Sequence, residues 1–221
     1  MTLSRKKKQG VIIGVVAIVF IGLAWVGYHK LRHRLPELPD SHYYAKLADR
    51  AKAAKKVAKR HHLNTDYCLF VDYGIPSGTP RLFVWSFKQN QVVATAYVMH
   101  GPGKGSTAKK AVFSNKPGSK CSSLGRFIVT REHGAKLKRS YRLKGLDTDN
   151  QSAFLRGLMI HQAKWVDMFS WKKHIPLNAR ACSGCVTVSS KGMDYLDNLI
   201  KRENKRLLLW TYCSKENRNF L

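Results

Sequence analysis

A histidine and a cysteine in the second half of the chain have the residue types of a nucleophile and its base. His161 follows the apolar run Leu-Met-Ile, and Cys185 precedes the β-prone run Val-Thr-Val. A thiolate is the attacking form of cysteine, and an imidazole accepts a thiol proton near neutral pH. Gly184 permits a tight turn that aims backbone N–H groups at a developing oxyanion. We expect two short strands to bring His161 and Cys185 together at one edge of a sheet.

Cys182 and Cys185 also form a C-x-x-C pattern, which is found in redox pairs and in zinc sites. A thioredoxin-like motif opens a helix, whereas here a strand follows. A structural zinc needs a second pair, and the other cysteines are scattered. We therefore expect no metal and no cofactor. A reversible bridge between Cys182 and Cys185 stays an alternative, and Cys68, Cys121, Cys182 and Cys213 are enough for two disulfides in an oxidising compartment.

The elements that position the pair are predicted to be mainly strands. The runs CLFVDYG, RLFVWSF and QVVATAYVMH are rich in Val, Phe and Tyr and are separated by turns, and FIVT, YRLKGL and RLLLWTY follow later. A helix capped by Ser189 or Ser190 would bury Met193, Leu196, Leu199 and Ile200. Many strands with few helices predict a mostly β (α+β) domain.

The N-terminal part differs from the rest of the chain in its charge and apolar content. Residues 11–28 carry no charge and follow a basic start, and roughly 20 apolar residues cross a bilayer as a helix. A cleaved signal peptide is the alternative, but no small-x-small cleavage site follows. We expect a basic cytoplasmic tail over residues 1–9, a transmembrane signal anchor over 10–28, a linker with a basic helix over 29–65, a catalytic domain over 66–212 and a C-terminal tail over 213–221.

The basic helix begins at Asp40 or Ser41 and places alanines and leucine on one face and lysines on the other. It either rests on anionic lipid headgroups or packs on the domain that follows. The net charge of +27 over 221 residues indicates a polyanionic partner. No nucleic-acid-binding motif is visible, so we expect no nucleic acid partner. A membrane-tethered basic module that binds polyanions without catalysis is an alternative function.

Several segments, in order, resemble the L,D-transpeptidase catalytic family, the YkuD-like cysteine enzymes of bacterial cell walls. The resemblance is to the branch with an SNKPGS…SSLG segment. It rests on VDYGIPS, RLFVWSF, MHG (99–101), FSNKPGSKCSSLGRFIVT (113–130), YRLKGLD (141–147), RGLMIHQAKWV (156–166) and CSGCVTV (182–188). It implies a β-sandwich with short helices.

The resemblance also implies roles for individual residues. Cys185 would be the nucleophile and His161 its base, with the backbone carbonyl of Gln162 fixing the histidine tautomer. The N–H groups of Gly184 and Cys185 would form the oxyanion hole. Candidate substrate contacts are Ser183, beside that hole, Ser123 and Gly125, in the SSLG turn, and His100, near a loop end.

The implied activity is the cross-linking of peptidoglycan stem peptides through a cysteine thioester. A carboxypeptidase or amidase of the same fold, which gives the acyl group to water, is the alternative. The implied location is the bacterial inner membrane, with a single span and the catalytic domain on the periplasmic side. Cys182 stands where the family has Ser or Thr, and Val186 stands where this branch often has Pro. These departures concern specificity and leave the Cys–His chemistry intact.

Overall fold

The computed structural model describes residues 14, 16–26, 40–135, 137 and 139–215. The chain divides into two compact units, residues 1–35 and 36–221. In the first unit, residues 16–26 are helical and exposed. No helix among the described residues is long and apolar enough to span a bilayer. The transmembrane helix predicted over 10–28 is therefore not found among them, and part of that stretch, like the 1–9 tail, lies outside the described residues.

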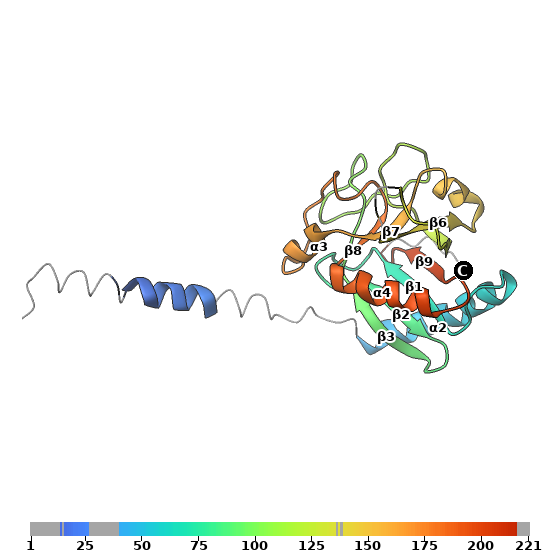
Figure 1. The fold of residues 1–221 in the computed structure, drawn as a ribbon, viewed down its shortest axis with the longest axis horizontal. Helices are drawn as coiled ribbons and strands as arrows, with labels where there is room; N and C mark the ends of the chain where they lie inside the picture. Colours follow the sequence, from blue (N-terminus) through green and yellow to red (C-terminus); the bar gives the residue numbers. More distant parts are fainter. Residues whose placement is uncertain (1–13, 15, 27–39, 136, 138, 216–221) are drawn as a thin grey trace, which may run out of the picture. The chain divides into compact units, whose positions relative to one another are not determined.

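The second unit is built on one curved nine-stranded sheet (Figure 1). Along the sheet the order is β3-β2-β1-β9-β5-β6-β7-β8-β4. The strands are β1 (Tyr67–Asp72), β2 (Leu82–Ser86), β3 (Gln91–Ala96), β4 (Val98–Met99), β5 (Gly125–Val129), β6 (Ser140–Gly145), β7 (Met159–Gln162), β8 (Val186–Val188) and β9 (Leu208–Tyr212).

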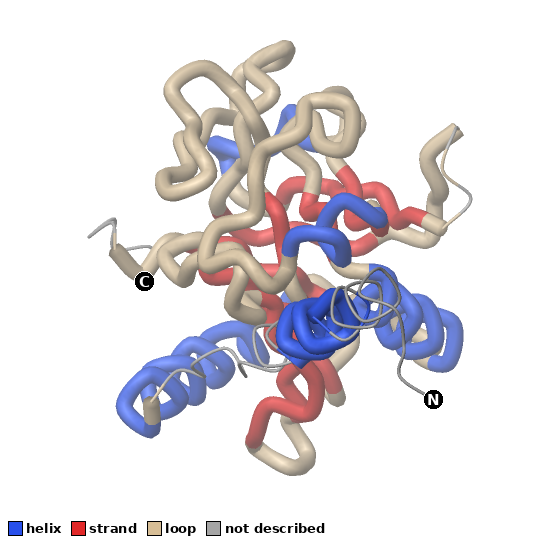
Figure 2. Tube along the Cα trace, turned by 90° about the vertical axis from the view of Figure 1, so that its left-hand side faces the viewer, coloured by secondary structure: helices blue, strands red, loops and turns tan. Residues whose placement is uncertain are grey.

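The mostly β class is confirmed, but the two layers of the predicted sandwich are joined. The last strand, β9, pairs in parallel with β1 and antiparallel with β5. It therefore connects the β1–β3 meander to the strands that follow β5, and the sheet continues from one half into the other. Figures 1 and 2 show long loops gathered at the end of the unit opposite the β2–β3 hairpin.

Four helical segments accompany the sheet: α2 (Ser41–Arg60), the 3₁₀ helix η1 (Thr148–Ala153), α3 (Lys164–Phe169) and α4 (Ser190–Arg202). The predicted helix starts of α2 and α4 are confirmed. The Asp40 carboxylate accepts the Tyr43 N–H at 2.8 Å, and the Ser189 hydroxyl accepts from Gly192. These caps satisfy N–H groups that have no partner within the helix.

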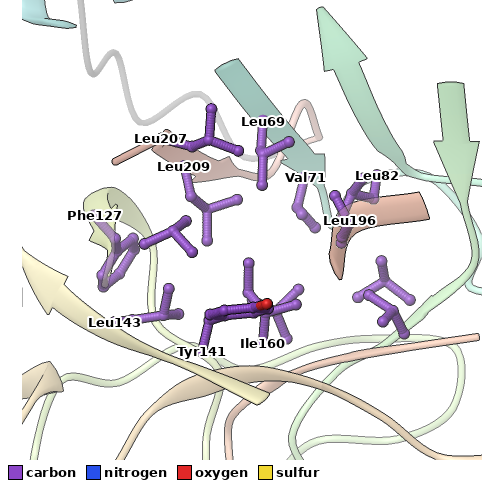
Figure 3. Close-up of a cluster of buried hydrophobic side chains, with 14 of the residues drawn as sticks. Leu69, Val71, Leu82, Phe127, Tyr141, Leu143, Ile160, Leu196, Leu207 and Leu209 are labelled. Carbon is purple, nitrogen blue, oxygen red and sulfur yellow. The ribbon is translucent and has the colours of Figure 1, made fainter. Parts of the chain in front are cut away.

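The central strands are buried on both faces because a helix covers each face. In β1 the alternate residues Leu69 and Val71 face an inner core that contains α4, and Figure 3 shows Leu196 of α4 among these side chains. Cys68 and Phe70 face the opposite way, toward the apolar side of α2. The α2 residues in that second core are Leu47, Ala51, Ala54, Val57 and Ala58. The basic helix thus packs on the domain, the second of the two predicted arrangements.

Candidate active site

The two candidate catalytic side chains are presented by neighbouring parallel strands. In the β7–β8 register, His161 is opposite Thr187 and Ile160 is opposite Val186. Because side chains alternate along a strand, His161 and Thr187 share a face. Cys185 precedes Thr187 by two residues, immediately before β8, and therefore lies on the same face. The predicted strand pair is confirmed, but β7 and β8 lie inside the sheet and β4 forms its edge.

The hydrogen bonds of His161 determine which ring nitrogen is the base. Nδ1 lies 3.0 Å from the carbonyl oxygen of Gln162, which only accepts, so Nδ1 carries the proton. Nε2 then carries the lone pair of the neutral ring and accepts the Thr187 hydroxyl at 3.2 Å. Burial lowers the pKa of His161, although the Gln162 carbonyl opposes this. The imidazole is therefore neutral and able to take a proton at Nε2.

The surroundings of Cys185 favour its protonated form. Burial, and next the neighbouring Cys182, raise its pKa to about 12, while backbone N–H groups of Met159 and Ser183 act in the opposite direction. Its sulfur donates to the Gly157 carbonyl at 3.9 Å. In the described part of the chain no hydrogen bond joins this sulfur to His161. Burial thus disfavours the charged form of both groups, the Cys185 thiolate and the His161 imidazolium.

Gly184 has a backbone conformation that other residues strongly disfavour. Its φ is +98°, and a Cβ at this position would overlap the carbonyl oxygen of Cys121. A Cβ on Gly101 would lie 2.7 Å from the Gly184 Cα. Two loops that are distant in sequence therefore press against the turn before Cys185, which limits how its N–H groups can be oriented.

Arg156 holds one of these loops in place. Its guanidinium donates four hydrogen bonds to the segment 114–123, to the Ser114 and Cys121 carbonyls and to the Ser119 and Ser123 hydroxyls. Arg156 also favours the thiolate of Cys185 electrostatically. By itself, a single arginine among 40 Lys and Arg residues does not indicate such a loop-bracing role.

The predicted substrate contacts fall into different environments. Ser183 is exposed beside the buried Gly184, so a ligand can reach it. Ser123 is buried, and its hydroxyl donates to the Ser114 carbonyl. Gly125 opens β5 and lies against the side chains of Asp147 and Asn150. His100 is 2 % exposed and uses both ring nitrogens within the protein. Only Ser183 is thus placed beside the Gly184–Cys185 turn with an exposed side chain.

Three of the four cysteines that could form two disulfides, Cys68, Cys121 and Cys182, are free thiols in the structure. Cys68 faces the α2 side of the sheet, whereas Cys182 lies in a separate cluster with Cys185, so the fold keeps these sulfurs apart. Cys182 donates to the Cys185 carbonyl oxygen at 3.4 Å. Among the described residues, no group of three or more His, Cys, Asp or Glu side chains is arranged to hold a metal.

The segment between His161 and Cys182 is a structured insertion. It contains α3 and an indole hydrogen bond from Trp165 to the Pro176 carbonyl at 2.8 Å. It docks on the turn between β1 and β2, where the Ile175 N–H donates to the Ser77 hydroxyl at 2.7 Å and the Gly78 N–H donates to the Lys173 carbonyl. These contacts fix the insertion beside the turn that leads from β1 to Arg81.

Comparison with known families shows to which family this chain belongs. The sequence profile of the L,D-transpeptidase catalytic domain matches residues 40–211, a range that contains α2, the whole sheet except its last residue, and the β7–β8 pair. The chain belongs to this family. The resemblance inferred from the sequence segments is confirmed.

Two further comparisons add little to this assignment. A search of curated protein sequences found no match. Among solved structures, the fold is similar to a variant of the helical cell shape determining protein Pgp2 from Campylobacter jejuni, with 11% identity and a TM-score of 0.42. That similarity covers 68% of this chain and 49% of the Pgp2 chain, so the present chain spans about half the length of that protein.

Proposed function

We propose that this protein is a cell-wall L,D-transpeptidase that forms peptidoglycan cross-links through a thioester on Cys185. The observation that supports the proposal is the β7–β8 pairing, which presents His161 and Cys185 on one face in a chain of the L,D-transpeptidase family. A sulfur nucleophile suits this reaction, because a thioester can pass its acyl group to a second amine.

In the proposed first step, the Cys185 thiol gives its proton to Nε2 of His161. The sulfur attacks the carbonyl carbon that joins the third stem residue to the terminal D-amino acid. The oxyanion that forms is stabilised by the N–H groups of Gly184 and Cys185, and one such donor contributes about 2.7–4 kcal/mol in comparable sites. The C–N bond then breaks, the leaving amine takes the proton from Nε2, and the D-amino acid departs.

In the second step, an amine from a neighbouring stem attacks the thioester. His161 takes a proton from that amine, the C–S bond breaks, and the sulfur is reprotonated as the imidazole returns to its neutral form. The Gln162 carbonyl keeps Nδ1 protonated throughout, so Nε2 alone exchanges the proton. Ser183 is exposed, and in this proposal its side chain contacts either peptide.

A carbapenem tests the nucleophile directly, because opening of the lactam ring leaves the intact drug on the attacking sulfur. We expect the full-length protein to gain one drug mass, mapped to Cys185, and Cys185→Ala to gain none. The matched control is Cys182→Ala, which removes the neighbouring buried thiol and is expected to keep the adduct. An adduct that persists in Cys185→Ala, or the lack of one in the unmodified protein, contradicts the assignment.

Product analysis then separates cross-linking from hydrolysis. Incubation with purified tetrapeptide muropeptides is expected to release the terminal D-amino acid and to yield cross-linked dimers. Trimmed monomers without dimers would mean that water is the acceptor, and the protein would then be a carboxypeptidase of the same fold.

We also propose that residues 10–28 anchor the protein in the bacterial inner membrane with the catalytic domain in the periplasm. Support comes from the uncharged stretch 11–28 behind a basic start and from the cell-wall substrate of the proposed reaction. Protease added to spheroplasts should remove the catalytic domain; protection of the domain until the membrane is lysed would contradict the orientation.

A further inference from the structure

A cavity of about 270 Å³ lies at the loop-bearing end of the domain, separate from the residues assigned to catalysis. Its walls come from the turn after β1, the start of β2, the end of β4, the 108–111 loop, the His161–Cys182 insertion and the chain after β9. No carboxylate of the described residues lines it. Its basic and imidazole side chains are Arg81, His100, Lys109, Lys110, His174 and Lys215.

Arg81 supplies a buried positive charge without an ion pair in the described structure. It is 2 % exposed and donates to the Val98 and Ile75 carbonyls, each at 2.9 Å, and to Nδ1 of His100. A guanidinium has five N–H groups, so one N–H on each of Nη1 and Nη2 has no such partner. The Asp72 carboxylate acts on Arg81 electrostatically but is hydrogen-bonded elsewhere.

An uncompensated buried charge is costly, so the environment of Arg81 is informative. Burial lowers the pKa of Arg81 to about 10, which leaves the group protonated at neutral pH. His100 accepts from Arg81 at Nδ1 and therefore donates from Nε2 to the Thr107 carbonyl at 2.8 Å. Burial lowers the pKa of His100 to about 4, so this ring is neutral. Arg81 is therefore the buried full charge among the lining residues, whereas the lining lysines are exposed.

Two other lining residues carry polar atoms that a ligand could contact. Nδ1 of His174 is buried and lacks a partner within the described part of the chain, and the buried Tyr73 hydroxyl has the Ser122 side chain as its neighbour. Burial lowers the pKa of His174, and the cations Lys173, Lys109, Lys215 and Arg81 lower it further. A negatively charged ligand would relieve this repulsion and supply the missing hydrogen-bond acceptors.

Two lining residues relate the cavity to the segment around Cys185. Tyr73 interacts electrostatically both with Arg81 and with Cys182 and Cys185. His100, on another wall, is followed by Gly101, whose close approach to Gly184 leaves no room for a Cβ.

We propose that this cavity binds a carboxylate of the peptide substrate, with Arg81 as its counterion and with Tyr73, His174 and Lys109 as further contacts. A carboxylate has two acceptor oxygens, which matches the two N–H groups that Arg81 leaves unused. The exposed lysines at the rim attract the anion, and the buried guanidinium fixes it. This inference rests on the proposed function, since it assigns a recognition site to the same substrate. It also gives the insertion, which supplies His174, a role in substrate selection.

The test uses the full-length Cys185→Ala protein, which binds without reacting. Calorimetric titration compares a stem tetrapeptide with the same peptide in which every carboxylate is a carboxamide. We expect the acid form to bind at least about tenfold more tightly, the usual effect of hydrogen bonds to a charged group. Equal affinity of the two peptides overturns the proposal. Tighter binding of inorganic phosphate than of the tetrapeptide overturns the assignment to a carboxylate.

Single substitutions test which residues cause the tighter binding of the acid peptide. Arg81→Gln is expected to abolish the difference between the two peptides, and its folding is checked by thermal melting. His174→Gln and Lys109→Gln concern partly exposed groups and should each reduce the difference roughly threefold. The matched control is Lys56→Gln, which removes one charge from the exposed face of α2 and should change nothing. A loss in Lys56→Gln equal to that in Lys109→Gln would mean general charge attraction and would overturn the site.

Failure of the site and failure of the proposed function give different results. If a carbapenem adduct forms on Cys185 but the acid and amide peptides bind equally, the cavity proposal is wrong and the proposed function stands. Acid-selective binding that depends on Arg81, in a protein that forms no adduct, removes the transpeptidase mechanism and retains the anion site.

Discussion

The replacement His161→Gln separates a catalytic base from a merely structural histidine. With a Cys185 pKa of about 12, the thiolate fraction at pH 7 is about 10⁻⁵ when no base assists. Loss of a general base typically costs about 10²–10⁴ in rate, so we expect carbapenem acylation of the variant at pH 7 to fall by that factor. Below pH 12 each added pH unit raises the thiolate fraction tenfold, and the variant rate should rise in proportion.

The unmodified protein should behave differently over the same range. Burial lowers the pKa of His161 from its ordinary value near 6.5, so the base is already neutral at pH 7. Its acylation rate should therefore be level between pH 7 and pH 9 and should decline in acid as the imidazole gains a proton. Stopped-flow or quenched mass spectrometry from pH 5 to pH 10 measures both profiles.

The matched control is His42→Gln, which changes an exposed histidine in the first turn of α2 and should reproduce the unmodified profile. A level profile for His161→Gln between pH 7 and pH 10, at any absolute rate, would show that another group takes the thiol proton. Our assignment of Nε2 would then be wrong.

Three further substitutions probe the surroundings of the site. Arg156→Ala removes four hydrogen bonds to the 114–123 loop and should lower the free energy of unfolding by about 2–4 kcal/mol in urea titrations; unchanged protease resistance of that loop would argue against this role. Gly184→Ala puts a side chain on a residue with positive φ, where its Cβ overlaps the Cys121 carbonyl oxygen. It should lower the free energy of unfolding by about 1–3 kcal/mol and abolish carbapenem acylation. A normal rate of adduct formation would contradict the strained turn. Leu47→Ala empties a buried position between α2 and the sheet and should cost about 2–5 kcal/mol while the folded fraction keeps its acylation rate; a negligible cost would mean that α2 is not docked.

The sequence alone determined the elements whose signals are local. The caps and apolar spacing that begin α2 and α4 act within a few residues, and the strand that delivers His161 is a run of side chains with high β propensity. The family segments predict Cys185 as the nucleophile and His161 as its base. Local interactions are readable from one stretch of chain because every group that takes part lies in that stretch.

Tertiary structure decided everything that depends on contacts between distant segments. The placement of β9 between β1 and β5 joined the expected sandwich layers, and the fold placed Cys68 and Cys182 in different clusters. Arg156 and Arg81 look alike in sequence, yet one braces a loop and the other is buried beside a cavity. A residue becomes buried, and its hydrogen-bonding groups are left unused, only when remote segments enclose it. The sequence around each arginine therefore does not predict its structural role.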